Sequence, residues 1–391
     1  MSETFCILPW MQVATNASGT FRVCCNSTPG KNFIKVNGHP AKIYRDEIEY
    51  AWNSVTLQNM REMFLSGKRP DICERCFREE DSGVKSARQS YNEKWMFNYE
   101  KSTRPPLIVK YIELRLGNLC NLKCRMCNPY ASSQWVKEWG IVDSATDQHK
   151  LPEKEVIRLS SMDWPKDDYV WRNIAQIISS VEEIYLTGGE PTLSEKHYDL
   201  LENCINGGYS KTITLKYNTN LTNIPKKLLE YWTNFKKVKI HTSVDAYGDL
   251  NRYIRYPSDW NNIANNLDIF YNLTKKHTNL ELDVHTTVQM YNILYLAELF
   301  AWLKQYGIVP YLNILNHPDY LNIRCLPEKL KEQSEKRLQL YLDKHKVAGL
   351  IKYMWAEDWS HNLPMFVDYT KTLDISRNQS IDDVCPDLSS L

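Results

Sequence analysis

The sequence predicts an α/β protein with parallel strands, preceded by a small cysteine-rich module and followed by a helical extension. From about residue 105 onward, strand-like and helix-like segments alternate, which is typical of parallel βα units. Closely spaced cysteines lie before residue 80, and residues 328–345 place leucines among charges, a pattern that favours an amphipathic helix. The predicted parts are the module at 1–104, the α/β region at 105–318 and the C-terminal extension at 319–391.

Composition narrows the class of protein. The 391 residues are 43% hydrophobic, enough for a substantial core, and their formal charge is +1. A nucleic-acid-binding protein more often has a basic excess, so a nucleic-acid partner is not expected. The N-terminus lacks a basic segment followed by an apolar run, and no stretch of about 18 apolar residues occurs. Because an odd number of cysteines (11) lies at metal-ligand spacings, we expect a reducing compartment, and therefore a soluble, cytoplasmic protein without a membrane partner.

Six strands and four helices are predicted in the α/β region. The strands are 111–116, 183–186, 212–217, 238–244, 281–288 and 311–315, and the helices are 194–205, 226–232, 260–273 and 294–305. Residues 138–168 form a long polar insertion, which is interpreted as a solvated decoration, with a substrate lid as the alternative.

Three cysteines follow the first predicted strand on one loop. Cys120, Cys124 and Cys127 have a CxxxCxxC spacing, and three thiolates leave the fourth position of a metal centre open. An independent signal follows the second strand, where residues 188–191 read Gly-Gly-Glu-Pro. Glycines allow a ligand to approach the backbone closely, and Glu190 offers a negative charge to an ammonium group.

The triplet, followed by a strand that ends in this GGEP segment, resembles the radical S-adenosylmethionine (SAM) superfamily. The resemblance implies a partial (βα)6 TIM-like barrel and a 4Fe-4S cluster held by Cys120, Cys124 and Cys127. It also implies that the open iron chelates the amino and carboxylate groups of SAM. Gly188, Gly189, Glu190 and Pro191 would then contact the SAM amino group. Both motifs follow strands directly, as expected for chemistry at the carboxyl ends of parallel strands.

One position departs from that family. Relatives usually have an aromatic residue immediately before the third cysteine, and here the residue is Met126. Methionine is apolar and adaptable enough to pack near an adenine.

Other SAM contacts are predicted at later strand ends. Asn220 is placed to reach a ribose or a carboxylate, although a rim turn without a ligand would look the same. The resemblance assigns the SAM carboxylate to Ser243 and Arg255, and guanidinium suits a carboxylate because it offers two parallel donors. The alternative for Arg255 is an ordinary surface charge. Val288 is the candidate for packing on adenine.

A second cysteine set precedes the barrel. Cys6, Gly19, Cys24 and the Cys73-x-x-Cys76 turn resemble the twitch or SPASM auxiliary-cluster module, which usually follows the barrel. The resemblance implies one auxiliary 4Fe-4S cluster with Cys6, Cys24, Cys73 and Cys76 as ligands, since no cysteine occurs between Cys76 and Cys120. Structural zinc is the alternative occupant, and the adjacent thiol, Cys25, is the alternative to Cys24 as a ligand. Three further cysteines are interpreted as small buried residues: Cys204, Cys325 and Cys385.

The resemblance implies that a reduced cluster passes one electron to SAM, and that the resulting 5′-deoxyadenosyl radical removes a hydrogen from the substrate. The predicted outcome is oxidation or cross-linking of a peptide side chain, with dehydrogenation of a small-molecule alcohol as an alternative. An electron donor such as flavodoxin or ferredoxin is expected as a partner. The auxiliary cluster would accept an electron from the substrate or position the module. A noncatalytic structural metal-binding module is the alternative of a different class. The sequence names no catalytic acid or base.

Overall fold

The computed structural model describes residues 3–28, 30, 33–81, 83, 85–95, 101–143, 151–160, 162–341, 347–389 and 391. Residues 144–150 and 161 of the predicted insertion, and residues 342–345 of the predicted C-terminal helix, lie outside the described residues. By contacts between residues, the chain divides into two compact units. The first comprises Met1–Gly117, Met162–Tyr217 and Glu230–Val238, and the second comprises Asn118–Ser161, Asn218–Leu229 and Lys239–Leu391.

The first unit contains a sheet in the order β7-β6-β5-β1-β2. Its strands are β1 (Gln12–Thr15), β2 (Phe21–Arg22), β5 (Tyr111–Arg115), β6 (Glu183–Thr187) and β7 (Thr214–Thr219), of which β7 belongs to this unit through Tyr217. β1 pairs with β2 as an antiparallel hairpin, whereas β1, β5, β6 and β7 run parallel. The hairpin therefore extends a parallel sheet at its edge.

Period-two alternation assigns the two faces of β5. Ile112 and Leu114 are completely buried, whereas Tyr111, Glu113 and Arg115 occupy the other face. The register places Glu113 opposite Tyr185 of β6. One face of the sheet is thus an apolar core and the other carries polar and charged side chains.

The helices of the first unit mostly belong to its N-terminal part. They are α1 (Ile48–Trp52), α2 (Val55–Leu65), α3 (Glu74–Asp81), α4 (Ala87–Trp95), α7 (Asp168–Ala175) and α8 (Lys196–Asn206), and a small hairpin joins β3 (Lys35–Val36) to β4 (His39–Pro40). α2 is fixed by the fully buried Arg61, which donates to the carbonyl oxygens of Pro9 at 2.9 Å and Trp52 at 3.0 Å. These bonds satisfy part of a guanidinium that burial would otherwise destabilise.

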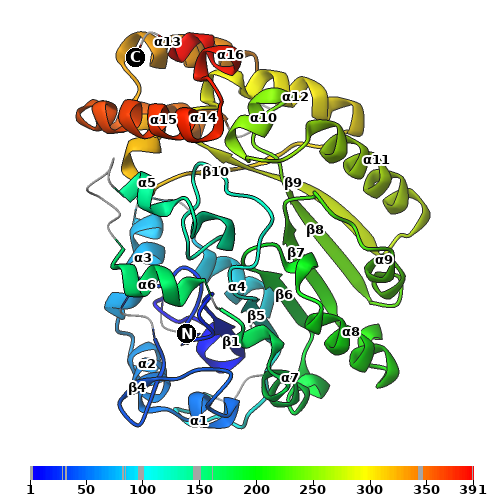
Figure 1. Ribbon diagram of the computed structural model, residues 1–391. Helices are drawn as coiled ribbons and strands as arrows, with labels where there is room; N and C mark the ends of the chain where they lie inside the picture. Colours follow the sequence, from blue (N-terminus) through cyan, green and yellow to red (C-terminus); the bar gives the residue numbers. More distant parts are fainter. Residues whose placement is uncertain are drawn as a thin grey trace. The chain divides into compact units, whose positions relative to one another are not determined.

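The second unit contains strands in the order β8-β9-β10. They are β8 (Lys237–Ser243, from Lys239 in this unit), β9 (Leu280–Val288) and β10 (Tyr311–Ile314), and β10 runs parallel to β9 with Tyr311 opposite His285. Figure 1 shows the C-terminal helices α13 to α16 gathered in orange and red. The helices of this unit are α5 (Trp139–Asp143), α6 (Glu153–Leu159), α9 (Lys226–Trp232, through Leu229 in this unit), α10 (Asp249–Ile254), α11 (Trp260–Lys276), α12 (Leu296–Leu303), α13 (Glu328–Leu338), α14 (Val347–Ala356), α15 (Leu363–Arg377) and α16 (Ile381–Val384).

The core of the second unit is rich in aromatic side chains. Trp135, Tyr291, Tyr320, Phe366 and Tyr369 are all buried in one apolar cluster. Three of these residues come from the C-terminal extension, so the extension shares the core of this unit. Aromatic groups bury large apolar areas, which makes this cluster a major source of its stability.

The prediction of an α/β fold with parallel strands is confirmed. All six predicted strands are present as β5 to β10, with ends that differ from the prediction by at most two residues, and α9 covers the predicted residues. Barrel closure and the three predicted domain boundaries stay predictions. None of the described helices combines the length and the apolar character of a membrane-spanning segment.

Candidate functional site

The loop after residue 117 places Cys120, Cys124 and Cys127 together in the second unit. Cys120 and Cys124 are buried in one apolar cluster with Leu122, and the half-buried Cys127 packs against this cluster. Met126 packs against this group, at the position where relatives have an aromatic residue. Three thiols on one short loop with an apolar floor fit a 4Fe-4S cluster that retains one open iron.

Two donors point at the first thiol. The backbone N–H of Leu122 lies 3.4 Å from Cys120 Sγ, and Asn220 Nδ2 lies 3.8 Å from the same sulfur. Asn220 Nδ2 also donates to Asn121 Oδ1 at 2.8 Å. The structure therefore places Asn220 against a predicted cluster ligand, where its amide can stabilise thiolate charge and tune the cluster potential. A contact from Asn220 to SAM itself stays a prediction.

Backbone hydrogen bonds hold the cysteine loop in place. Lys123 N donates to Tyr256 O at 2.7 Å, and Arg125 N donates to Ile254 O at 2.8 Å. The indole N–H of Trp135 donates to Cys124 O at 3.0 Å. Because these bonds satisfy the loop's own backbone groups, the loop presents its sulfurs in a fixed arrangement.

The loop has a buried charged anchor that the sequence did not reveal. Arg125 is 0% exposed, its guanidinium lies over the ring of Tyr253 at 3.5 Å, and its Nη2 pairs with Asp374 of α15. Nη2 also donates to Gln379 at 3.1 Å, and the Tyr369 hydroxyl donates to the carbonyl of Arg125. Asp374 is about 250 residues away in the chain, and no local pattern marks such a partner.

Arg255 lies near the cysteine loop and faces a buried carboxylate. Its Nε is 2.8 Å from Asp245 Oδ2, and Asp245 is fully buried. Burial lowers the pKa of Arg255, but Asp245 and the thiols of Cys124 and Cys127 raise it above its ordinary value. Arg255 is thus a charged buried group in this part of the chain, not the surface charge of the alternative interpretation. No hydrogen bond among the described residues engages its two Nη atoms.

The two remaining SAM candidates of the second unit lie on strands. Ser243 ends β8 and is half-buried on the same face as His241, so its hydroxyl is accessible at a strand end. Val288 ends β9 and is completely buried in the aromatic core. Its predicted packing on adenine stays a prediction.

The GGEP segment follows β6 in the first unit. Gly188 has φ +87° and Gly189 has φ +51°, a region that non-glycine residues rarely adopt. A Cβ on Gly188 would lie 2.9 Å from the backbone of Arg115, Leu116 and Gly117. The side chain of Glu190, 1% exposed, accepts from Thr192 N at 3.2 Å and Thr192 Oγ1 at 2.8 Å, and Pro191 begins a buried 3-10 turn. The carboxylate is therefore held in one orientation.

Replacing Gly188 by alanine is expected to destabilise the protein by about 2 to 5 kcal/mol, because left-handed strain and a backbone clash add together. Gly208 is the matched control, since it has φ +75° but no atom within 4 Å of the point that a Cβ would occupy. Gly208→Ala should cost only the conformational part, about 1 to 2 kcal/mol. Urea unfolding of both variants measures the difference, and equal losses would contradict a close approach at Gly188.

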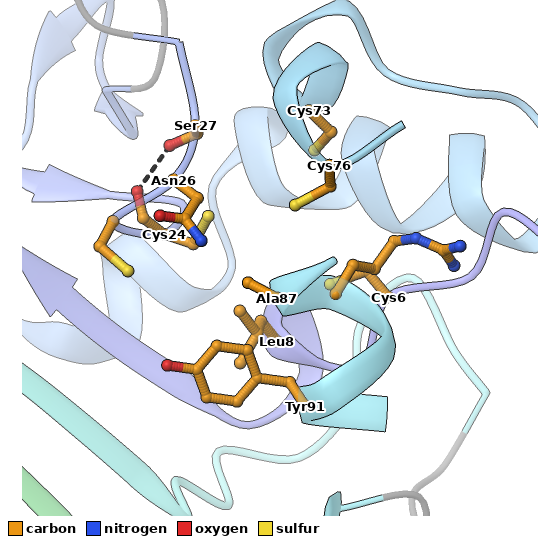
Figure 2. Close-up of a pocket in the computed structure, with 11 residues that line it drawn as sticks. Cys6, Leu8, Cys24, Asn26, Ser27, Cys73, Cys76, Ala87 and Tyr91 are labelled. Carbon is orange, nitrogen blue, oxygen red and sulfur yellow. Dashed lines mark hydrogen bonds between the residues drawn. The ribbon is translucent and has the colours of Figure 1, made fainter. Parts of the chain in front are cut away.

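Five thiols of the first unit line a single cavity. They are those of Cys6, Cys24, Cys25, Cys73 and Cys76, together with Tyr91 and Arg88. Figure 2 shows Cys24 on one side of this cavity and Cys73 with Cys76 on another. The arrangement brings the four predicted auxiliary ligands together from segments far apart in the sequence.

Local structure explains how these cysteines meet. Cys24 follows the β1–β2 hairpin, Cys73 ends a 3-10 turn, and Cys76 lies in the first turn of α3. Thr28 N donates to Ile72 O at 2.9 Å, which joins the loop after Cys24 to the turn before Cys73. One hydrogen bond thereby links the two segments that carry these predicted ligands.

Burial controls the protonation of these thiols. It raises the pKa of Cys6, Cys24, Cys73 and Cys76, so the metal-free thiols are neutral. Among the described residues, no group of three or more His, Cys, Asp or Glu side chains is arranged so that it could hold a single metal ion. The thiols instead surround a cavity, which suits a cluster whose iron atoms each take one thiolate.

Cys25 differs from its neighbours in its surroundings. Burial raises its pKa, and Glu113 raises it further through its charge and a hydrogen bond. Cys25 lines the same cavity. The three cysteines predicted to be small buried residues, Cys204, Cys325 and Cys385, are each fully buried, which confirms that prediction.

Comparison with known proteins finds a family model and several solved structures that are similar to this chain. Residues 114–314, slightly more than half of the chain, match the model of the Radical SAM superfamily. No curated protein sequence matches the chain. SuiB of Streptococcus suis bound to S-adenosylmethionine is 15% identical, with 57% of this chain and 42% of that chain covered and a TM-score of 0.34. Native anSMEcpe with bound AdoMet is 16% identical, with 59% of each chain covered and a TM-score of 0.37. The chain spans less than two thirds of either protein.

Proposed function

The chain belongs to the radical SAM superfamily, and we propose that it reductively cleaves SAM and removes a hydrogen atom from a peptide side chain, which is then oxidised or cross-linked. The observation that supports this proposal most is the loop with Cys120, Cys124 and Cys127. All three cysteines belong to or pack against one apolar cluster with Leu122, and backbone hydrogen bonds hold the loop.

We assign the first 4Fe-4S cluster to this loop. When bound, the cluster supplies the electron for reductive cleavage of SAM. Leu122 N and Asn220 Nδ2 would donate to Cys120 Sγ, which stabilises negative charge on that ligand. Burial of the loop limits access of water, as radical chemistry requires. An external donor such as flavodoxin or ferredoxin would deliver the electron.

The chain offers complementary groups for the two charged ends of the methionyl part of SAM. Arg255 is held charged by Asp245, and its Nη atoms would bind the SAM carboxylate as a bidentate partner. Ser243 would add a hydroxyl donor. The GGEP segment is the candidate contact for the SAM ammonium group, because Glu190 carries a negative charge and Gly188 and Gly189 permit close backbone approach.

We assign a second 4Fe-4S cluster to Cys6, Cys24, Cys73 and Cys76. Four sulfur ligands from a cavity-lining set fit such a cluster, and they leave no iron open for the substrate. Arg88, which lines the cavity and pairs with Glu80, would balance part of the thiolate charge. Zinc is the competing occupant and Cys25 the competing ligand.

The test is anaerobic reconstitution of the full chain with iron and sulfide, followed by dithionite and SAM. We expect 5′-deoxyadenosine and methionine to form in equal amounts. A Cys204→Ala variant is the matched control, because Cys204 is a fully buried thiol of α8 that we assign to no cluster. Absence of 5′-deoxyadenosine from fully iron-loaded protein would leave only the noncatalytic metal-binding alternative.

A further inference from the structure

The polar face of the sheet in the first unit carries more positive than negative charge. Glu113 of β5 pairs with Arg22 of β2 at 2.5 Å, with side chains 2% and 6% exposed. On β6, Glu183 pairs with Lys216 of β7 at 2.8 Å and also with Lys94 of α4. Two carboxylates on this face are thus paired with three cations. Arg115 adds a fourth cation.

Arg115 is the fourth cation and has no ionic partner among the described residues. It ends β5 on the same face as Glu113, two residues along the strand. No described residue forms a hydrogen bond or an ion pair with its guanidinium. An arginine with five donors and no acceptor has its full capacity available for a ligand.

Arg115 is exposed to solvent but has other protein groups close to it. Its side chain reaches solvent, and yet burial lowers the pKa of Arg115, with Arg22 lowering it further. Protein atoms thus crowd a guanidinium that is still accessible. An anion bound there would be partly desolvated, which strengthens the attraction relative to bulk water.

Arg22 is a second guanidinium on this face with a donor that forms no hydrogen bond among the described residues. Its Nε is buried and has no hydrogen-bond partner among the described residues, although its Nη2 meets Glu113. Two neighbouring guanidiniums with spare donors favour a carboxylate ligand.

Arg115 lies near a segment that is assigned to SAM and near a cysteine of the N-terminal cavity. The backbone of Arg115 lies against Gly188 of the GGEP segment, since a Cβ on Gly188 would meet Arg115 C at 2.9 Å. Cys25 of the auxiliary cavity interacts electrostatically with Arg115 and with Glu113. Arg115 is therefore next to the segment assigned to the SAM ammonium group and close to the cavity assigned to the second cluster.

We propose that Arg115 binds a carboxylate of the substrate and so selects a peptide with an acidic side chain. This inference rests on the proposed function, because it names the substrate class of that enzyme. Arg22 assists by holding positive charge on the same face of the sheet, while Glu113 fixes Arg22. Arg115 acts here as a specificity-determining residue that positions the peptide.

The experiment uses two matched tripeptide probes, dansyl-Ala-Asp-Ala amide and dansyl-Ala-Asn-Ala amide, which differ only in the charge of the central side chain. Fluorescence anisotropy measures their binding to the reconstituted, SAM-loaded full chain. The wild type should bind the acidic probe at least about tenfold more tightly than the neutral one, as expected for a charge-assisted bidentate contact. Arg115→Gln should remove this preference, and Arg115→Lys should restore part of it.

Arg172→Gln is the matched control, since Arg172 is an exposed arginine of α7 in the same unit. It should bind both probes like the wild type. Unchanged acidic preference in Arg115→Gln, or equal affinity of the wild type for both probes, would overturn the proposal. A shifted cluster potential in Arg115→Gln with unchanged probe binding would also overturn it, and would show that Arg115 only balances cluster charge. Probe binding does not need SAM cleavage, so failure of 5′-deoxyadenosine formation in the wild type is a separate result.

Discussion

Replacing Cys120, Cys124 and Cys127 together by alanine is expected to abolish 5′-deoxyadenosine formation and to remove about half of the bound iron. The triplet would hold one four-iron cluster and the N-terminal cysteines another, so iron should fall from about eight to about four atoms per chain. The cavity with Cys6, Cys24, Cys73 and Cys76 lies in the other unit and is formed without any residue of the triplet. Iron, sulfide and zinc analysis, with product chromatography, measures both effects.

The matched control for this variant is the triple replacement of Cys204, Cys325 and Cys385, which are buried thiols outside both cysteine sets. It should retain about eight iron atoms if it folds, as two four-iron clusters require. Loss of all iron from the first variant would contradict a second iron-sulfur cluster. Zinc in place of the residual iron would establish the zinc alternative for the N-terminal cavity.

Replacing Arg125 by methionine is expected to destabilise the protein by about 3 to 5 kcal/mol, because it breaks a buried ion pair and leaves Asp374 without its partner. The same change frees the cysteine loop, since Arg125 Nε also donates to Tyr253 O at 3.0 Å. SAM cleavage should therefore fall together with stability. The midpoint of urea unfolding, followed by circular dichroism, measures the first effect.

Arg252→Met is the matched control for Arg125→Met. Arg252 is an exposed arginine of α10 in the same unit, and its replacement should change the free energy of unfolding by no more than about 0.5 kcal/mol. Asp374→Asn is a second probe, because it removes the negative charge of the pair with little change of shape. If both Arg125→Met and Asp374→Asn unfold at the wild-type urea concentration, the C-terminal helix does not anchor the loop.

Much of the parallel sheet was predictable because its signals are local. The six strands β5 to β10 are apolar or alternating runs between turn residues, and a period of two in the chain translates directly into buried and exposed faces. The predicted ends differ from the observed ones by at most two residues, since strand ends depend on neighbouring strands as well as on their own residues. The hairpin of β1 and β2 lies at the edge of the same sheet as β5, and no local pattern could have predicted that pairing.

Part of the candidate site could also be predicted from local sequence, whereas other parts required the folded chain. The positions of Cys120, Cys124, Cys127 and the GGEP segment follow from short motifs, and Gly188 has the left-handed conformation that favours glycine. The placement of Asn220 against Cys120 required the folded chain, because no spacing rule predicts a side-chain contact across 100 residues. The sequence predicts Val288 as a residue that packs on adenine because it lies near a strand end. Only the fold shows that aromatic groups enclose it.

The sequence by itself determined the chemistry available to this protein: the ligand triplet, the glycine-rich strand end, the cysteine pairs of the N-terminal part and the alternation of strands and helices. The tertiary structure alone decided which distant groups meet. It joined Arg125 to Asp374, surrounded one cavity with five thiols, and left Arg115 without a counter-ion among the described residues beside Gly188. The physical reason is that motifs and periodicity depend on neighbours in the chain, whereas ion pairs, cavities and unbalanced charge depend on packing between segments that the chain order does not bring together.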